Sequence, residues 1–489
     1  MRLNETQLDR LPAHVGRPGY DRSKLKAGIV HLGVGGFHRA HQAMYVDRLA
    51  REGLADGWGI CGMGVMPQDA LMRDALAAQD GLYTLVVKNP DGTRLTRVIG
   101  SITEYVHAPD NPAAAVERLA DPDIHIVSLT VTEGGYNFHQ VTGEFDLTAP
   151  AVQADLAHPD RPGTVFGLVA AALDLRRSRG LPPFTVMSCD NVQGNGVMAR
   201  RSFTAYARAL DPALADWMDA QVAFPNSMVD RITPRTTDAD RAELSRLDGI
   251  EDAWPVVCED FAQWALEDSF SSGRPPFERA GVDVVAGVEP FELMKLRLLN
   301  ASHQALCYFG HLATYRAVHD AVRDPDIARF LRRYMDQEAT PTLEPVPGVD
   351  LEAYKGQLIE RFGNANVADT VARLCAESSD RIPKWLMPVV RINLAAGRPV
   401  ALAAAVVASW ARYAEGVDEQ GAPIEVVDRL APRLTAAARR YPEDPAAFIR
   451  DRELFGDVAE EPRFREPYLA ALRSLHERGS KETLAALVA

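Results

Sequence analysis

Short apolar runs alternate with longer segments of helical spacing from the start of the chain to about residue 285. Apolar runs of about four to eight residues, bounded by turn residues, predict buried strands. The segments between them, such as 165–177 and 200–209, are typical of helices that cover a sheet. This alternation predicts an α/β fold with a Rossmann-type, doubly wound and mostly parallel sheet. The predicted strands are 28–32, 58–65, 83–88, 94–99, 124–130, 184–188, 254–258 and 282–285.

The pattern changes at about Glu289, beyond which apolar positions recur at helical intervals and strand-like runs almost disappear. With 489 residues, the chain is too long for one ordinary core. We therefore predict two domains, an α/β domain over 1–287 and a mostly α-helical domain over 288–489. The predicted helices of the second domain are 325–336, 351–362, 366–375, 399–414, 426–440 and 462–476. In the first domain, the strands flanking Asn89-Pro90-Asp91-Gly92 predict a hairpin attached to the main sheet.

Composition narrows the class of protein. The hydrophobic content of 47% and charged content of 25% are those of a globular protein, and the net charge of −14, with no basic stripe, argues against nucleic acid as a partner. The N-terminus carries no apolar signal region, and the apolar run 400–411 is too short to span a bilayer, so we expect a cytoplasmic protein without a membrane partner. The five cysteines are widely spread and form no CxxC pair, which predicts neither disulfides nor a zinc site.

A glycine-rich turn follows the first predicted strand. Gly33-Val34-Gly35-Gly36-Phe37 lies between that strand and a helix, which is the order in which a dinucleotide pyrophosphate is bound. The match to G-x-G-x-x-G is incomplete because His38 stands where the third glycine would allow close packing of helix and sheet. An ordinary tight turn is the alternative reading.

Asp69 follows the second predicted strand. An acidic residue there commonly binds the ribose hydroxyls of NAD, and its charge would repel the 2′-phosphate of NADP. This favours NAD, although Arg73 nearby keeps NADP open. Alternatively, Asp69 only caps the helix predicted over 70–77.

Polar residues gather after several other strands. These are the segments from Thr132 to Tyr136, from Cys189 to Asn191, from Asn226 to Pro234, and Glu259-Asp260. Each has a simple alternative, since such residues also cap helices and make turns. Because parallel sheets bind ligands beyond the carboxyl ends of their strands, four such segments together predict one cleft.

Residues 291–303 carry the candidate chemistry. On an α-helical wheel, at about 100° per residue, Lys295, His303 and Asn300 lie at roughly 0°, 80° and 140°, and Glu292 lies at roughly 60°. Burial would disfavour the charged form of Lys295 and make its amine a general base usable near neutral pH. The alternative is an amphipathic helix whose lysine extends to water.

These motifs together closely resemble the polyol-specific long-chain dehydrogenases, the zinc-independent mannitol dehydrogenase family, from residue 27 to the C-terminus. The most specific are Gly33-x-Gly35-x-Phe37-x-Arg39-x-His41, Thr132-Glu-Gly-Gly-Tyr136, Ser188-Cys-Asp-Asn191, Phe224-Pro-Asn226 through Asp230-Arg-Ile-Thr-Pro234, and Lys295 through Asn300 to His303. Ala253-Trp-Pro-Val-Val-Cys-Glu259 and Met294-Lys295 resemble the bacterial mannitol-oxidising branch.

The resemblance implies roles for individual residues. Lys295 would be the general base, with Asn191 and Asn300 stabilising the oxyanion and His303 orienting substrate or base. Asp230 and Arg373 match substrate-binding positions, whereas Arg381 stands where that branch usually has Lys, which leaves the polyol preference open. Glu292 would relay protons to water, unless it only forms an ion pair with Lys295. The expected cofactor-binding residues are Gly33, Gly35, Gly36, Phe37, Arg39, Asp69, Thr132 and Glu133.

The expected function is the interconversion of D-mannitol and D-fructose, and also of D-arabinitol and D-xylulose, by hydride transfer to NAD, without a metal. We expect a small-molecule polyol or ketose as the substrate, and a monomer or weak dimer. One alternative is a hexuronate (fructuronate or tagaturonate) reductase, for which Arg373, Arg381 or Lys384 could bind the substrate carboxylate. Another is a non-catalytic sugar or nucleotide sensor.

Overall fold

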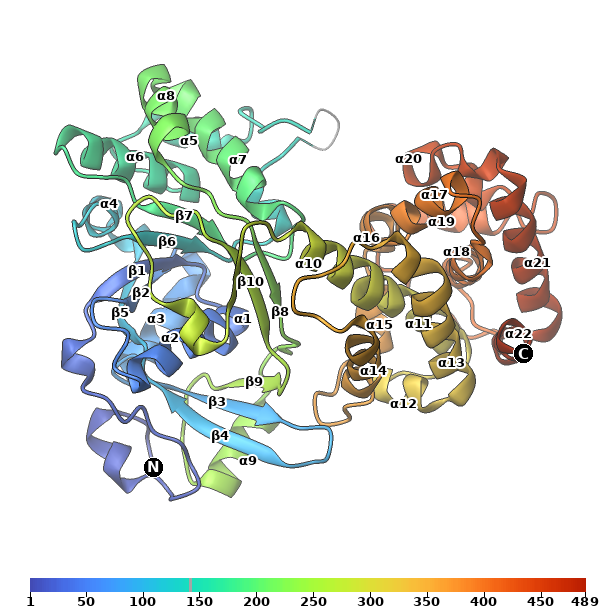
Figure 1. Ribbon diagram of the computed structural model, residues 1–489, viewed down its shortest axis with the longest axis horizontal. Coiled ribbons are helices and arrows are strands. Elements are labelled where there is room, and N and C mark those ends of the chain that lie inside the picture. The colour runs from blue at the N-terminus through green and yellow to red at the C-terminus, as the bar shows by residue number, and fades with distance from the viewer. Residues whose placement is uncertain (140–142) are drawn as a thin grey trace. The chain divides into compact units, whose positions relative to one another are not determined.

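The structure, a computed structural model, describes residues 1–139 and 143–489. The chain divides into two compact units, Met1–Glu289 and Pro290–Ala489. The first is an α/β unit and the second is built of helices (Figure 1). The predicted fold class, a Rossmann-type sheet followed by a helical domain, is therefore confirmed.

A five-stranded parallel sheet forms the centre of the first unit. Its strand order is β5-β2-β1-β6-β7, so β1 lies between β2 and β6 in the middle of the sheet. Leu32 at the end of β1 pairs with Met63 on one side and Leu129 on the other, which brings the carboxyl ends of these strands together. The bounds are β1 Ala27–Leu32, β2 Gly59–Gly64, β5 Ile102–His107, β6 Ile126–Leu129 and β7 Thr185–Ser188.

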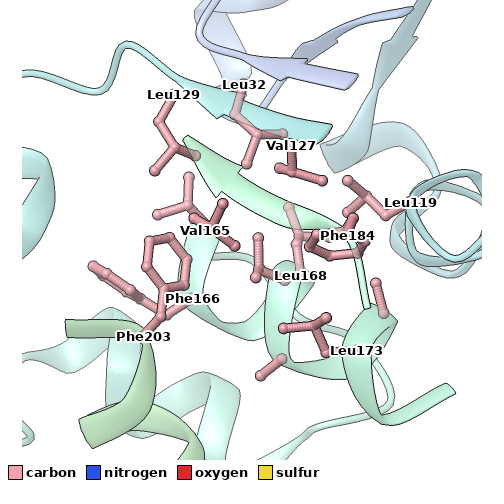
Figure 2. Close-up of a cluster of buried hydrophobic side chains, with 14 of the residues drawn as sticks. Leu32, Leu119, Val127, Leu129, Val165, Phe166, Leu168, Leu173, Phe184 and Phe203 are labelled. Atoms are coloured by element: carbon pink, nitrogen blue, oxygen red, sulfur yellow. The ribbon is translucent and has the colours of Figure 1, made fainter. Parts of the chain in front are cut away.

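Strands β1, β2, β6 and β7 are buried on both faces, whereas the edge strand β5 is partly exposed. Figure 2 shows one face, where Leu32, Val127 and Leu129 of the strands lie against Val165, Phe166 and Leu168 of α6. The other face packs on α2 and α3. The helices of this unit are α1 Gly36–Ala40, α2 Gln42–Arg51, α3 Ala70–Ala77, α4 Pro112–Leu119, α5 Pro150–Ala157, α6 Val165–Ser178, α7 Asn195–Leu210, α8 Pro212–Gln221 and α9 Asp238–Asp248.

The predicted hairpin forms, but its expected attachment to the main sheet is wrong. Strands β3 (Tyr83–Lys88) and β4 (Arg94–Ile99) pair antiparallel, and β3 then pairs with β9 (Val256–Glu259) in a separate sheet of order β4-β3-β9. A third sheet, of order β11-β10-β8, contains β8 (Ser227–Asp230), β10 (Gln263–Glu267) and β11 (Asp283–Val285). The strands predicted at 254–258 and 282–285 thus exist but belong to these smaller sheets.

The second unit consists of helices that surround α11, whose residues are almost all buried. None of the helices in the described parts of the chain has the length and apolar character needed to cross a membrane. Two segments, Lys295–Asn300 and Met335–Ala339, are wound as π-helices. The helices are α10 Glu289–Met294, α11 Ala301–Leu312, α12 Val318–Arg323, α13 Pro325–Tyr334, α14 Leu351–Phe362, α15 Val371–Cys375, α16 Ser378–Trp385, α17 Met387–Ala395, α18 Ala401–Ala414, α19 Ala431–Ala438, α20 Arg452–Phe455, α21 Pro462–Arg478 and α22 Ser480–Val488.

His38, which stands in place of the third glycine of the dinucleotide motif, stacks on His31 of β1. The ring of His38, which is 1% exposed, lies 3.4 Å from that of His31 in β1, centroid to centroid. His31 is hydrogen-bonded to the hydroxyls of Ser128 and Thr130, and the side chain of Gln42 lies beside His38. Burial lowers the pKa of His31 to about 3 and holds that of His38 well below its ordinary value. Both rings are therefore neutral at physiological pH.

Replacing His38 with Phe keeps an aromatic ring on His31 and removes a titrating group. The unfolded chain protonates His38 below about pH 6.5 while the native protein does not, so the wild type loses up to about 1.4 kcal/mol per pH unit for each such histidine as the pH falls. We expect the decrease in Tm between about pH 7 and pH 5 to be smaller in H38F. Thermal unfolding at several pH values measures this, and an equal decrease in both proteins would contradict the buried neutral state.

Candidate active site

The glycine turn after β1 has no room for a side chain at its first position. Gly33 has a φ of +90°, and a Cβ there would lie 2.4 Å from the carbonyl oxygen of Thr130. The amide of Gly33 donates to Met63 and its carbonyl accepts from the Thr130 hydroxyl, which ties the turn to the ends of β2 and β6. Gly35 is exposed and its surroundings are open. This leaves bare backbone at the edge of the sheet where a pyrophosphate would lie.

Arg39 supports this turn from inside the protein. Its side chain is buried, donates from Nε to the Gly35 carbonyl at 3.3 Å and from Nη1 to the Trp254 carbonyl, and lies over the ring of Tyr83. The hydroxyl of Tyr83 in turn donates to the Arg39 carbonyl at 2.6 Å. The geometry therefore favours an indirect role for Arg39, in which it holds the glycine turn. Phe37, half-buried, stacks on His41 in the same turn.

Asp69 lies just beyond the end of β2. Its Oδ2 accepts from the amides of Val65 and Met66, both at 2.9 Å, so it closes the loop after the strand and does not cap α3 through its side chain. No hydrogen bond within the described residues ends on its Oδ1. Arg73 is paired with Asp74 and Asp110, at 2.8 and 2.5 Å, and its charge is therefore compensated within the protein. Both observations favour a ribose diol over a 2′-phosphate at this position.

The loops after β6 and β7 carry three predicted site residues. Thr132 and Glu133 lie beyond β6, and Asn191 is exposed beyond β7. The Asn191 loop is fixed by Asn195, which donates to the carbonyls of Asp190 and Ser227 at 2.9 and 2.7 Å. Asn226, from the sequence motif 224–226, fixes the start of the helix that follows this loop, because its side chain accepts from the first amides of α7.

Asp230 lies in the separate sheet of β8, not in the main one. It is the last residue of β8, is buried, and pairs with Gln263 of β10. The next residue, Arg231, donates to the carbonyls of Ala40 and Glu259, which ties this strand end to α1 and to the end of β9. The four polar segments thus lie at strands of three different sheets, whereas the sequence predicted that they follow strands of a single sheet.

The π-helix at the start of the second unit changes the face on which the candidate residues lie. The amide of Ala301 donates to the carbonyl of Leu296, five residues earlier. In such a helix, residues five apart lie roughly one turn apart, so Lys295 and Asn300 share one side, whereas an α-helix would separate them by roughly 140°. Lys295 is 7% exposed and Asn300 is 5% exposed, and the Asn300 Oδ1 has no hydrogen-bond partner in the described residues.

His303 and Glu292, on the adjoining helical turns, are also buried. The ring centroid of His303 lies 4.5 Å from that of Phe362. His303 also lies near Asp369: burial alone would raise the pKa of Asp369, but the hydrogen bonds and charge of Arg373, together with the charge of His303, lower it. Sequence reasoning missed Asp369, although its spacing of four residues from Arg373 within the helix predicted over 366–375 was a usable signal. In the structure, α15 begins only at Val371, so Asp369 lies before the helix.

The three predicted cationic groups differ in their pairing. Arg373 is exposed, and its guanidinium binds both carboxylate oxygens of Asp369 at 2.6 and 2.5 Å. Arg381 donates to the carbonyls of Arg373 and Leu374 and lies over the ring of Trp385; no carboxylate pairs with it in the parts of the chain that the structure describes. Lys384 is exposed. Among residues 1–139 and 143–489, no group of three or more His, Cys, Asp or Glu side chains is arranged to hold a metal ion.

Comparison with known proteins identifies the family. The model of the mannitol dehydrogenase Rossmann domain matches residues 27–279, and that of the mannitol dehydrogenase C-terminal domain matches residues 287–476. The chain belongs to the mannitol dehydrogenase family. It is 46% identical to the mannitol 2-dehydrogenase of Phaeosphaeria nodorum, over 99% of this chain and 85% of the relative. It is 45% identical to a mannitol dehydrogenase of Saccharomyces cerevisiae, over 98% and 95% of the two chains.

Solved structures of family members have the same fold. The Pseudomonas fluorescens mannitol 2-dehydrogenase, in a ternary complex with NAD and D-mannitol, aligns with a TM-score of 0.88 at 45% identity, over 100% of this chain and 99% of that one. A substrate-free D-sorbitol dehydrogenase aligns with a TM-score of 0.93 at 38% identity, over 99% and 100%. The resemblance inferred from the sequence motifs is confirmed.

The two glycines of the turn provide a matched pair of variants. Gly33→Ala forces a side chain into positive φ and against the Thr130 carbonyl, so we expect its free energy of unfolding to fall by about 1–3 kcal/mol or more. Gly35→Ala meets nothing closer than 3.9 Å at a φ of −100° and should leave stability nearly unchanged. Chemical denaturation compares the two, and equal stability would contradict the close approach. NADH binding should weaken in both, because Gly33→Ala displaces the turn and the methyl group of Gly35→Ala covers exposed backbone at the expected pyrophosphate site.

Proposed function

We propose that this member of the mannitol dehydrogenase family is an NAD-dependent polyol dehydrogenase that interconverts D-mannitol and D-fructose, and also D-arabinitol and D-xylulose. The observation that carries the chemistry is that Lys295 and Asn300 are both buried and share one side of a π-helix. The named activities and ligands of relatives at 45% identity support the substrate class.

NAD, when bound, supplies the acceptor for the hydride that leaves the carbinol carbon. The glycine turn fits its pyrophosphate because Gly35 is exposed and carries no side chain, and Asp69 offers Oδ1 to the ribose hydroxyls. Thr132 and Glu133 would border the same edge of the sheet. Hydride loss from an alcohol needs no metal if side chains take the proton and stabilise the developing charge on oxygen.

In alcohol oxidation, Lys295 takes the hydroxyl proton. Its side chain is buried, and removal from water is one condition under which an amine acts as a base near neutral pH. Asn191 and Asn300 donate hydrogen bonds to the substrate oxygen as it becomes an alkoxide. His303 orients the substrate or the base, and Glu292, three residues before Lys295, relays the proton to water. In ketose reduction the same groups act in reverse.

Asp230, Arg373 and Arg381 bind the rest of the substrate in this proposal. The bidentate pair with Asp369 neutralises Arg373 and orients it, as suits hydrogen bonding to hydroxyl groups. Arg381 is the specific reason to test a hexuronate reductase as well, since its charge is not matched by a carboxylate in the described residues and could bind one on the substrate. Comparing fructose with fructuronate as substrates separates the two activities.

The central experiment measures turnover of polyols by the wild type and by Lys295→Ala. With NAD and D-mannitol we expect turnover by the wild type and a decrease by a factor on the order of 10² to 10⁴ in K295A, the usual contribution of a positioned general base. NADH binding, followed by fluorescence, should survive the substitution. An unchanged rate in K295A removes Lys295 from the mechanism. NADH binding by the wild type without turnover of any polyol or ketose would instead favour the sensor.

Cofactor selectivity is tested by Asp69→Ala. Hydrogen bonds to a charged group contribute about 1.5–3 kcal/mol, so losing those to the ribose should lower NAD affinity about tenfold or more. Removing the carboxylate also removes its repulsion of a 2′-phosphate, so the preference for NAD over NADP should fall further. Glu117→Ala, which removes a surface carboxylate elsewhere in the same unit, is the control. If kcat/KM for the two cofactors keeps its wild-type ratio in D69A, Asp69 serves only the loop after β2.

A further inference from the structure

A buried carboxylate, Asp190, joins the loops that follow β6 and β7. It is 6% exposed, and its oxygens accept from the amides of Val131 and Thr132 at 3.1 and 2.7 Å. The Tyr136 hydroxyl also donates to it at 2.8 Å and lies 2.5 Å from the Ser188 hydroxyl. Burial raises the pKa of Asp190, and these three hydrogen bonds oppose the rise. The carboxylate, which follows β7, therefore binds the backbone of the loop that follows the neighbouring strand β6.

The loop that Asp190 holds contains a strained residue. Thr132 has a φ of +67° and a ψ of 169°, a backbone conformation that is unfavourable for a β-branched residue. Such a conformation persists only where the surroundings enforce it. Here the enforcing contacts are the two successive amides, at positions 131 and 132, that point to one carboxylate. Next to them, a Cβ at Gly135 would meet the Val131 side chain at 2.8 Å, so the loop is also closely packed.

Asp190 is itself fixed from the other side. Its amide donates to the Ser188 hydroxyl at 3.2 Å, and its carbonyl accepts from the Asn195 side chain at 2.9 Å. Asn195 also donates to Ser227, which anchors it to β8. Hydrogen bonds thus fix the loop after β7 that carries the carboxylate, and the carboxylate in turn binds the strained loop after β6. The strained loop carries Thr132 and Glu133 at the edge of the sheet where the glycine turn lies.

We propose that Asp190 is a positioning residue that holds Thr132 at positive φ and thereby preorganises the loop 131–136 for the dinucleotide. This inference rests on the proposed function, in that the ligand is NAD or NADH. Asp190 does not touch the cofactor in this proposal; it acts through the backbone of Thr132. Without the carboxylate, the threonine relaxes to negative φ and the loop leaves the binding conformation.

A double-mutant cycle with Asp190→Asn and Thr132→Gly tests the coupling. Asn has the shape of Asp, but one of its two oxygens becomes an NH₂ group that cannot accept from a backbone amide. Glycine adopts positive φ without steric cost, so the loop of the T132G variant no longer needs the carboxylate. The readout is the Kd for NADH, measured by fluorescence in the four proteins without any polyol.

We expect D190N to weaken NADH binding about tenfold or more in the wild-type background, and less than about threefold in the T132G background. Equal losses in both backgrounds would show that Asp190 affects NADH binding independently of the Thr132 backbone and would overturn the proposal, as would no loss in D190N. If D190N is recovered unfolded, the yield of folded D190N/T132G decides: recovery of the fold in the double variant supports the coupling, and its failure overturns it.

Asp155 supplies a matched control. It is also a buried carboxylate of the same unit that accepts from two successive amides, those of Gly163 and Thr164, and from the Thr164 hydroxyl. Asp155→Asn should lower the Tm and leave the Kd for NADH unchanged; a tenfold loss of affinity there would remove the special role of Asp190. Absence of polyol turnover in the wild type would overturn the proposed function and leave this comparison intact, because NADH binding is read by itself.

Discussion

The carboxyl ends of β1, β2 and β6 meet at one edge of the sheet, and this close approach of three backbones governs the rest of the first unit. Helices cover both faces of these strands, so the loops that follow the strands lie at that edge and are fixed there by contacts with one another. Gly33 follows because a Cβ would overlap the Thr130 carbonyl. The turn that results exposes bare backbone, which is why the proposed cofactor site is made largely of main-chain groups, with side chains holding them in place.

Buried charged side chains fix many of these main-chain groups. Positively charged side chains bind carbonyl groups, and negatively charged ones bind amide groups. Arg39 and Arg231 donate to carbonyls, whereas Asp190 and Asp252 accept from amides. A buried charge is costly unless it is hydrogen-bonded, and a carbonyl or amide at the end of a strand is costly unless it has a partner. Each arrangement satisfies both requirements at once. Arg39 in the sequence motif is thus explained by the shape of the glycine turn, without contact with a ligand.

Much of the α/β unit could be predicted from hydrophobic pattern because the central strands β1, β2 and β6 are buried on both faces and read as largely apolar runs. The bounds of β3 and β4 match the predicted ones. The sequence did not reveal β5, β8 or β10, nor the pairing of β3 with β9. Of these strands, β5 mixes apolar and polar residues, and β8, Ser-Met-Val-Asp, is short and half polar. Pairing joins segments far apart in the chain, and an apolar run does not record which neighbour it will find. The hairpin was therefore assigned to the wrong sheet.

The candidate site shows a different kind of limit. Residue types identified Lys295, Asn300 and His303, but their arrangement depends on helical winding, and the π-helix has no marker in an apolar pattern that fits an α-helix equally well. π-helical turns are rare and occur mostly as single turns inside α-helices, so an apolar pattern is interpreted as an α-helix by default. Here Arg297 donates to the Thr342 carbonyl, and the Tyr334 hydroxyl donates to the Arg297 carbonyl at 3.4 Å, just before the second π-helix. The π-helical segment that carries Asn300 thus makes contacts far away in sequence, from Arg297 to Tyr334 and Thr342, and an apolar pattern does not record such contacts.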